Sequence, residues 1–88
     1  MTEVLAFLLM LGCAPNAEVR IDHAIPYAGG YENGIVRVKD INNTSVLVHE
    51  IWHNCQEQKY GPIRSDEDHR AREHEAERVQ RLWLQYSS

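Results

Sequence analysis

The chain has 88 residues, of which 43% are hydrophobic and 25% charged, and its formal net charge is −4. This length and composition predict one small folded domain spanning residues 1–88, and they exclude a disordered or fibrous chain. Basic residues alternate with acidic ones, as in residues 64–70, so no basic face is offered to phosphates and we expect no nucleic-acid partner.

The N-terminal segment is apolar from Val4 to Leu11 and is followed by Gly12 and Cys13. It has two interpretations, a first helix packed on the core or a signal segment ending in a lipoprotein cleavage box. No positive charge precedes the run, and it is too short to span a bilayer. We therefore favour an N-terminal helix within residues 1–14 and a cytoplasmic location, whereas the other interpretation implies export or a lipid anchor in a membrane.

The only two cysteines are Cys13 and Cys55. They do not supply the ligands of a cysteine-rich zinc finger, so any metal must be bound by histidine and carboxylate. Because nothing in the sequence indicates an oxidising compartment, we expect two free, buried thiols rather than a disulfide.

Two short strands are predicted after the apolar segment. Alternating residues over 19–24 indicate the first, and the turn dipeptide Asn33-Gly34 precedes the second, Ile35–Lys39. The β-branched residues and basic alternates of this second strand are typical of an edge strand with one buried face. An α+β fold with a sheet of two to three strands follows.

From about Asn43 to Gln58 the pattern becomes helical, with Asn42 or Asn43 as the N-cap and Gly61-Pro62 as the stop. Two faces of this helix differ in polarity. The polar face carries His49, Glu50 and His53, and the opposite, apolar face carries Leu47, Val48, Ile51, Trp52 and Cys55. The helix is therefore expected to bury one side and to present both histidines to a cleft.

The segment from His49 to His53 is a His-Glu-x-x-His motif, which in zinc peptidases supplies two metal ligands and a general base. Residues four apart share a helix face, so both imidazoles reach one metal ion while Glu50 faces the metal-bound water. Catalytic zinc takes three protein ligands and leaves a fourth position for water, so a third ligand is required.

A second helix is predicted from the cap Ser65 to about Tyr86. Glu73 on this helix is the favoured third ligand, because the preceding loop is long enough to turn the chain back toward the motif. Three neighbours on the same helix compete for the role: His69, Glu75 and Glu77.

The motif helix together with Glu73–Glu77 resembles the gluzincin clan of zinc metallopeptidases, and within it most closely the ImmA/IrrE-type peptidases. The resemblance implies a minimal zincin-like domain that binds one Zn²⁺ per chain and hydrolyses peptide bonds. It further implies a role for each matched residue: metal ligands His49, His53 and Glu73, general base Glu50, and Glu77 as the acid that orients a ligand imidazole.

A peptide or protein is the expected substrate, and strand Ile35–Lys39 is expected to bind it as an added strand. The group that stabilises the oxyanion is left among Tyr60, His69 and Tyr86. An alternative function is a zinc-binding module with little or no catalysis that binds a peptide or protein partner.

Overall fold

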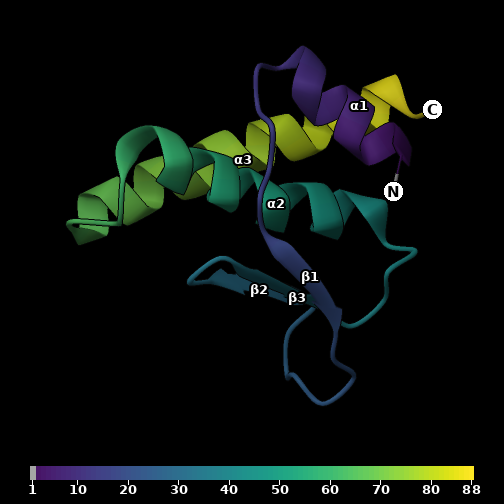
Figure 1. The fold of residues 1–88 in the computed structure, drawn as a ribbon, viewed down its shortest axis with the longest axis horizontal. Helices are drawn as coiled ribbons and strands as arrows, with labels where there is room; N and C mark the ends of the chain where they lie inside the picture. Colours follow the sequence, from purple (N-terminus) through teal and green to yellow (C-terminus); the bar gives the residue numbers. More distant parts are fainter. Residues whose placement is uncertain (1) are drawn as a thin grey trace.

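Three helices and a three-stranded mixed sheet make up residues 2–88, the part of the chain that the computed structural model describes (Figure 1). The elements run in the order α1 (Thr2–Met10), β1 (Glu18–Ile21), β2 (Gly29–Glu32), β3 (Ile35–Val38), α2 (Thr44–Tyr60) and α3 (Asp66–Tyr86). The expected α+β class is confirmed.

The sheet has the strand order β1-β3-β2, so β3 lies in the centre. It pairs in parallel with β1 and antiparallel with β2, and Val36 and Val38 are fully buried. Asn33 and Gly34, with φ of 50° and 80°, form the turn between β2 and β3. The prediction that Ile35–Lys39 is an edge strand was wrong, because a third strand pairs with its second side.

That third strand, β2, is an edge strand lying against α2. At Gly29 an added Cβ would lie 2.7 Å from Val46 Cγ1 and 3.2 Å from Glu50 Cγ, so only glycine permits this approach. Because Gly29 and Gly30 have no side chains, the alternation that predicts strands is missing from this segment. The edge of the sheet consequently passes beside the His-Glu-x-x-His motif.

The ends of α2 and α3 follow the predicted signals. The Asn43 side chain accepts a hydrogen bond from the Val46 N–H, and Gly61, with φ of 78°, ends α2. Ser65 accepts from the Asp68 N–H at the start of α3, where three acidic residues favour the positive end of the helix dipole.

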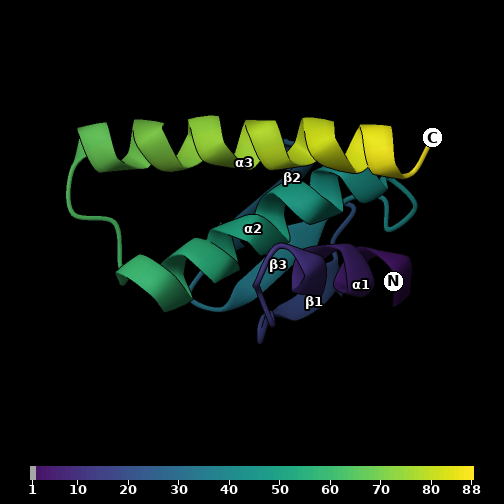
Figure 2. The same ribbon diagram turned by 90° about the horizontal axis from the view of Figure 1, so that it is seen from above.

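Helix α2 packs against the sheet and against α3, which runs beside it (Figures 1 and 2). The core consists of aliphatic and aromatic side chains from four elements, α1, β3, α2 and α3: Val4, Phe7, Leu8, Val36, Val38, Leu47, Val48, Ile51, Val79 and Trp83. Trp83 also donates to Thr44 Oγ1 over 3.0 Å, which joins α3 to the start of α2. The core lies on the apolar face of α2, as the sequence predicts.

Helix α1 buries Val4, Phe7 and Leu8, and the Phe7 ring packs edge-on against Trp83 with centroids 5.4 Å apart. The chain then turns at Gly12, and Cys13 forms a disulfide with Cys55 of α2 across a Cα–Cα distance of 5.8 Å. The prediction of two free thiols was wrong, because the docking of α1 brings together cysteines that are distant in the sequence. Within residues 2–88, none of the helices combines the length and apolar character needed to cross a membrane.

Candidate metal centre

Three side chains from two helices converge at the polar face of α2. His49, His53 and Glu73 each offer one ligand atom, and these atoms lie within 4.8 Å of one another. Glu73 Oε1 is 3.4 Å from His49 Nε2 and 2.5 Å from His53 Nε2. Of the four acidic or histidine residues considered on α3, Glu73 is the one in this cluster, as favoured from the sequence.

The cluster fits a divalent metal ion in its donor set and in its spacing. Two histidines and one glutamate are a set that binds zinc in catalytic sites, and two atoms bound to tetrahedral zinc lie about 3.3–3.4 Å apart. The His49–Glu73 distance has this value, whereas His53 Nε2 and Glu73 Oε1 lie closer together than two ligand atoms of one zinc ion. The three residues are therefore close to a ligating arrangement.

In both histidines Nδ1, the ring nitrogen that does not contact Glu73, contacts a glutamine side chain. His49 Nδ1 lies 2.9 Å from Gln80 Oε1, and His53 Nδ1 lies 2.9 Å from Gln56 Oε1. The expectation that Glu77 would orient a ligand imidazole was wrong, because Glu77 is exposed and Gln80 takes that place. Gln80 stands two helical turns after Glu73 and shares its face more closely than Glu77 does, which is a signal that the sequence contains.

Helix α3 is fixed beside α2 by the buried Arg72, the neighbour of Glu73. The Arg72 guanidinium donates to the carbonyl oxygens of Gly61 and Pro62 in the connecting loop and to Asp68 Oδ1. Its hydrogen bond to Asp68 holds the pKa of that carboxyl below its ordinary value. Arg72 thus ties the start of α3, next to Glu73, to the loop that precedes it.

Two carboxyl groups at the cluster have pKa values shifted in opposite directions. Burial raises the pKa of Glu50; the positive charges of His49 and His53 oppose this shift, and the charge of Glu73 adds to it. Burial also acts to raise the pKa of Glu73, but its contacts with the two histidines outweigh burial and lower it. Glu73 therefore has the character of an ionised ligand and Glu50 that of a base closer to neutral pH.

The cluster opens into a cleft of about 530 Å³ between the β2 edge, α2 and α3. Glu50 and His69 line this cleft together with the metal-site residues and with Gly29, Tyr31, Glu32 and Asn33 of the hairpin. The Tyr31 hydroxyl donates to Glu57 Oε1 and accepts from the Gly34 N–H, and burial raises its pKa. The Tyr31 hydroxyl is thus hydrogen-bonded to other residues in the wall of the cleft.

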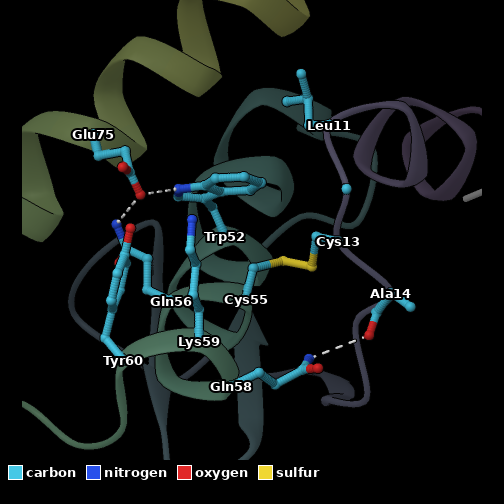
Figure 3. Close-up of a pocket in the computed structure, with 11 residues that line it drawn as sticks. Leu11, Cys13, Ala14, Trp52, Cys55, Gln56, Gln58, Lys59, Tyr60 and Glu75 are labelled. Atoms are coloured by element: carbon cyan, nitrogen blue, oxygen red, sulfur yellow. Dashed lines mark hydrogen bonds between the residues drawn. A yellow bond between two sulfur atoms is a disulfide. The ribbon is translucent and has the colours of Figure 1, made fainter.

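Two of the three expected oxyanion donors lie elsewhere. Tyr86 packs on the rings of Phe7 and Trp83, and Tyr60 lines a separate pocket of about 320 Å³ beside the disulfide (Figure 3). His69 is the one expected donor that lines the cleft. The predictions for Tyr60 and Tyr86 were wrong because both face other parts of the molecule.

The fold and the site together define a small α+β domain with a His–His–Glu cluster suited to a metal ion, at the wall of a cleft. Comparison with models of protein families, with curated proteins and with solved structures finds no match to this chain.

Proposed function

We propose that this protein is a zinc-dependent metallopeptidase with a minimal zincin-like fold. The observation that carries the proposal is the convergence of His49, His53 and Glu73 with Glu50 in the same cleft. Two ligands and the base come from one helix and the third ligand comes from the next, which is the arrangement that the His-Glu-x-x-His chemistry requires.

A zinc ion bound by His49, His53 and Glu73 would supply a Lewis acid and a water of lowered pKa. Glu50 is the residue that takes the proton from this water and returns it to the leaving amine. Its burial suits this role, because a raised pKa brings a carboxylate base closer to the pH at which it works. Glu73 stays ionised and neutralises part of the positive charge at the site.

The peptide substrate is proposed to bind along β2. This strand pairs with β3 on one side only, and its residues line the cleft beside Glu50. An extended peptide that adds to the free edge gains backbone hydrogen bonds and lies across the metal site. β2 thereby takes the role that the sequence indicated for Ile35–Lys39.

His69 is the proposed donor to the developing oxyanion, because it lines the cleft one helical turn before Glu73. A specific observation favours a second function, a zinc-binding module with little turnover. The His69 side chain is exposed, and the Tyr31 hydroxyl is held by other partners, so neither is fixed toward the metal site. Catalysis depends on donors that are already oriented.

The test compares the parent chain with Glu50→Gln and with Glu67→Gln, a charge-matched change at an exposed position on α3. Zinc content is measured by metal analysis, and cleavage is followed on a mixture of unstructured peptides with and without a chelator. We expect all three proteins to bind one zinc per chain. Glu50→Gln should lower the cleavage rate by roughly 10²–10⁴-fold, the usual contribution of a general base, and Glu67→Gln should leave it unchanged.

Full activity in the zinc-loaded Glu50→Gln protein contradicts the mechanism. Stoichiometric zinc without cleavage of any peptide by the parent chain supports the binding module instead. A parent chain that binds no zinc contradicts both functions.

A further inference from the structure

Each metal-site imidazole must carry its proton on Nδ1 if Nε2 is to bind a metal ion, so the partner of Nδ1 has to be a hydrogen-bond acceptor. In this chain both partners are glutamine side chains, Gln56 for His53 and Gln80 for His49. A glutamine amide has an accepting end and a donating end, and only the accepting end is compatible with metal binding. The contacts that fix the orientation of each amide therefore affect whether the two histidines can bind a metal ion.

The Gln56 amide is fixed by two acceptors on α3. Its Nε2 donates to the Arg72 carbonyl oxygen over 2.8 Å and to Glu75 Oε1 over 3.1 Å, and the side chain is 2% exposed. Turning the amide over would place its oxygen against two other acceptors, the Arg72 carbonyl and the Glu75 carboxylate, in a buried setting. Gln56 Oε1 is thus directed at His53 by the bonds that its nitrogen makes.

Glu75 is in turn held by Trp52 of α2. The indole Nε1 donates to Glu75 Oε1 over 2.8 Å, so one carboxylate oxygen accepts from both Trp52 and Gln56 (Figure 3). A continuous set of hydrogen bonds therefore runs from Trp52 through Glu75 and Gln56 to His53. It joins α2 to the same helix that carries Glu73.

We propose that Gln56, oriented by Arg72 and Glu75, is the positioning residue that accepts from His53 Nδ1–H and so directs Nε2 at the metal ion. The inference rests on the proposed metal function, because without a metal ion Glu73 Oε1, 2.5 Å from His53 Nε2, is a second acceptor for the imidazole proton. The packing of α3 against α2 then has two effects. It places Glu73 in the ligand cluster, and it orients Gln56 so that the proton of His53 lies on Nδ1.

Gln80 offers an internal comparison. It contacts His49 in the same way, but it is only half-buried, and within residues 2–88 its amide nitrogen makes no hydrogen bond that would fix its orientation. It is free to turn over in response to His49. The two glutamines should therefore differ in how strongly their loss affects the site.

The first experiment measures the ¹⁵N shifts of the histidine ring nitrogens in the zinc-loaded parent chain. We expect His53 to bind the ion through Nε2 and to carry its proton on Nδ1. Binding through Nδ1 overturns the proposal without any variant having to fold.

The second experiment removes the acceptor with Gln56→Met, of similar length, and uses Gln80→Met as the matched control. Zinc affinity is measured by competition with a chelator, and circular dichroism checks the helices. We expect affinity to fall roughly 10–100-fold for Gln56→Met, the usual effect of losing a group that orients a metal-bound histidine, and to fall less for Gln80→Met. Equal affinity in the parent and Gln56→Met, with the His53 tautomer unchanged, overturns the proposal.

If Gln56→Met fails to fold, the double variant Gln56→Glu with Glu75→Gln is used instead. It keeps a hydrogen-bond acceptor at position 56 facing His53, and it places a donor at position 75 of α3 facing position 56. This double variant should bind zinc more tightly than the single variant Gln56→Glu, in which two carboxylates oppose each other. The reverse order overturns the proposal. Absence of zinc binding in the parent chain would refute the proposed function and this inference with it, whereas zinc binding through His53 Nδ1 would refute this inference alone.

Discussion

At the scale of single residues, Glu73 differs from the other acids of α3 in what surrounds it. Its carboxylate contacts both imidazoles, and these contacts lower its pKa despite partial burial. Glu75 accepts from Trp52 and Gln56, and Glu77 is exposed. Three acids spaced two residues apart therefore have three separate roles.

This difference predicts the outcome of removing single carboxylates. Glu73→Gln should weaken zinc binding by more than the roughly 10–100-fold typical of an orienting group, because a ligand is lost directly. Glu77→Gln, with the same change of charge, should stay within about twofold of the parent. Isothermal titration with zinc measures both, and a large loss in Glu77→Gln alone would move the third ligand to that residue.

The three residues of the candidate metal site were largely predictable from the sequence, whereas the residues that orient them were not. The spacing of His49 and His53 fixes a shared helix face, and a third ligand is demanded by zinc chemistry. Glutamine is a residue type common on protein surfaces, and the role of Gln56 and Gln80 depends on how α3 is rotated against α2. Only the packing of two helices reveals it.

At the scale of elements, the disulfide between Cys13 and Cys55 ties the segment after α1 to the motif helix. Disulfides persist in oxidising compartments, so we propose such a compartment in place of the cytoplasmic location expected from the sequence. Cys55 lies on the apolar side of α2, away from the ligand cluster. The disulfide should therefore support the fold rather than the chemistry.

Replacing both cysteines, Cys13→Ser with Cys55→Ser, is predicted to lower the free energy of unfolding by about 4 kcal/mol, the chain-entropy value for a loop of this size. The sequence separation that enters this value is 42 residues. Urea unfolding of the parent and the double variant measures the difference, with thiol labelling of the parent as the check that the bond is formed. Zinc affinity under folding conditions should change little, and a large loss of affinity would show that the disulfide positions the histidines.

The order of the strands shows why elements are harder to predict than motifs. The predicted strand Ile35–Lys39 has basic alternates, Arg37 and Lys39, that are typical of an exposed edge. In β3, however, Val36 and Val38 are fully buried and both sides of the strand are paired. The strand that forms the edge contains Gly29 and Gly30, which have no side-chain pattern to read. Here the close approach of the Gly29 backbone to Glu50, which no side-chain pattern signals, accompanies the position of the strand beside α2.

At the scale of the whole molecule, the candidate metal site lies where the two longest helices meet. Its three residues come from α2 and α3, and Arg72 donates to the loop between these helices. A chain of 88 residues has a small core, so a link between these helices adds appreciably to stability. Binding of zinc and folding should therefore be coupled.

This coupling gives a quantitative expectation for thermal unfolding. Free zinc at 100 times its dissociation constant should stabilise the fold by about 2.7 kcal/mol, provided that the unfolded chain does not bind it. For a domain of this length each kcal/mol raises the Tm by roughly 4–8 °C, so the shift should be about 10–20 °C. Differential scanning calorimetry with and without zinc measures it. Glu73→Gln, scanned at the same zinc concentration, should show a much smaller shift; a shift equal to that of the parent would place the stabilising ion somewhere other than the His49–His53–Glu73 cluster.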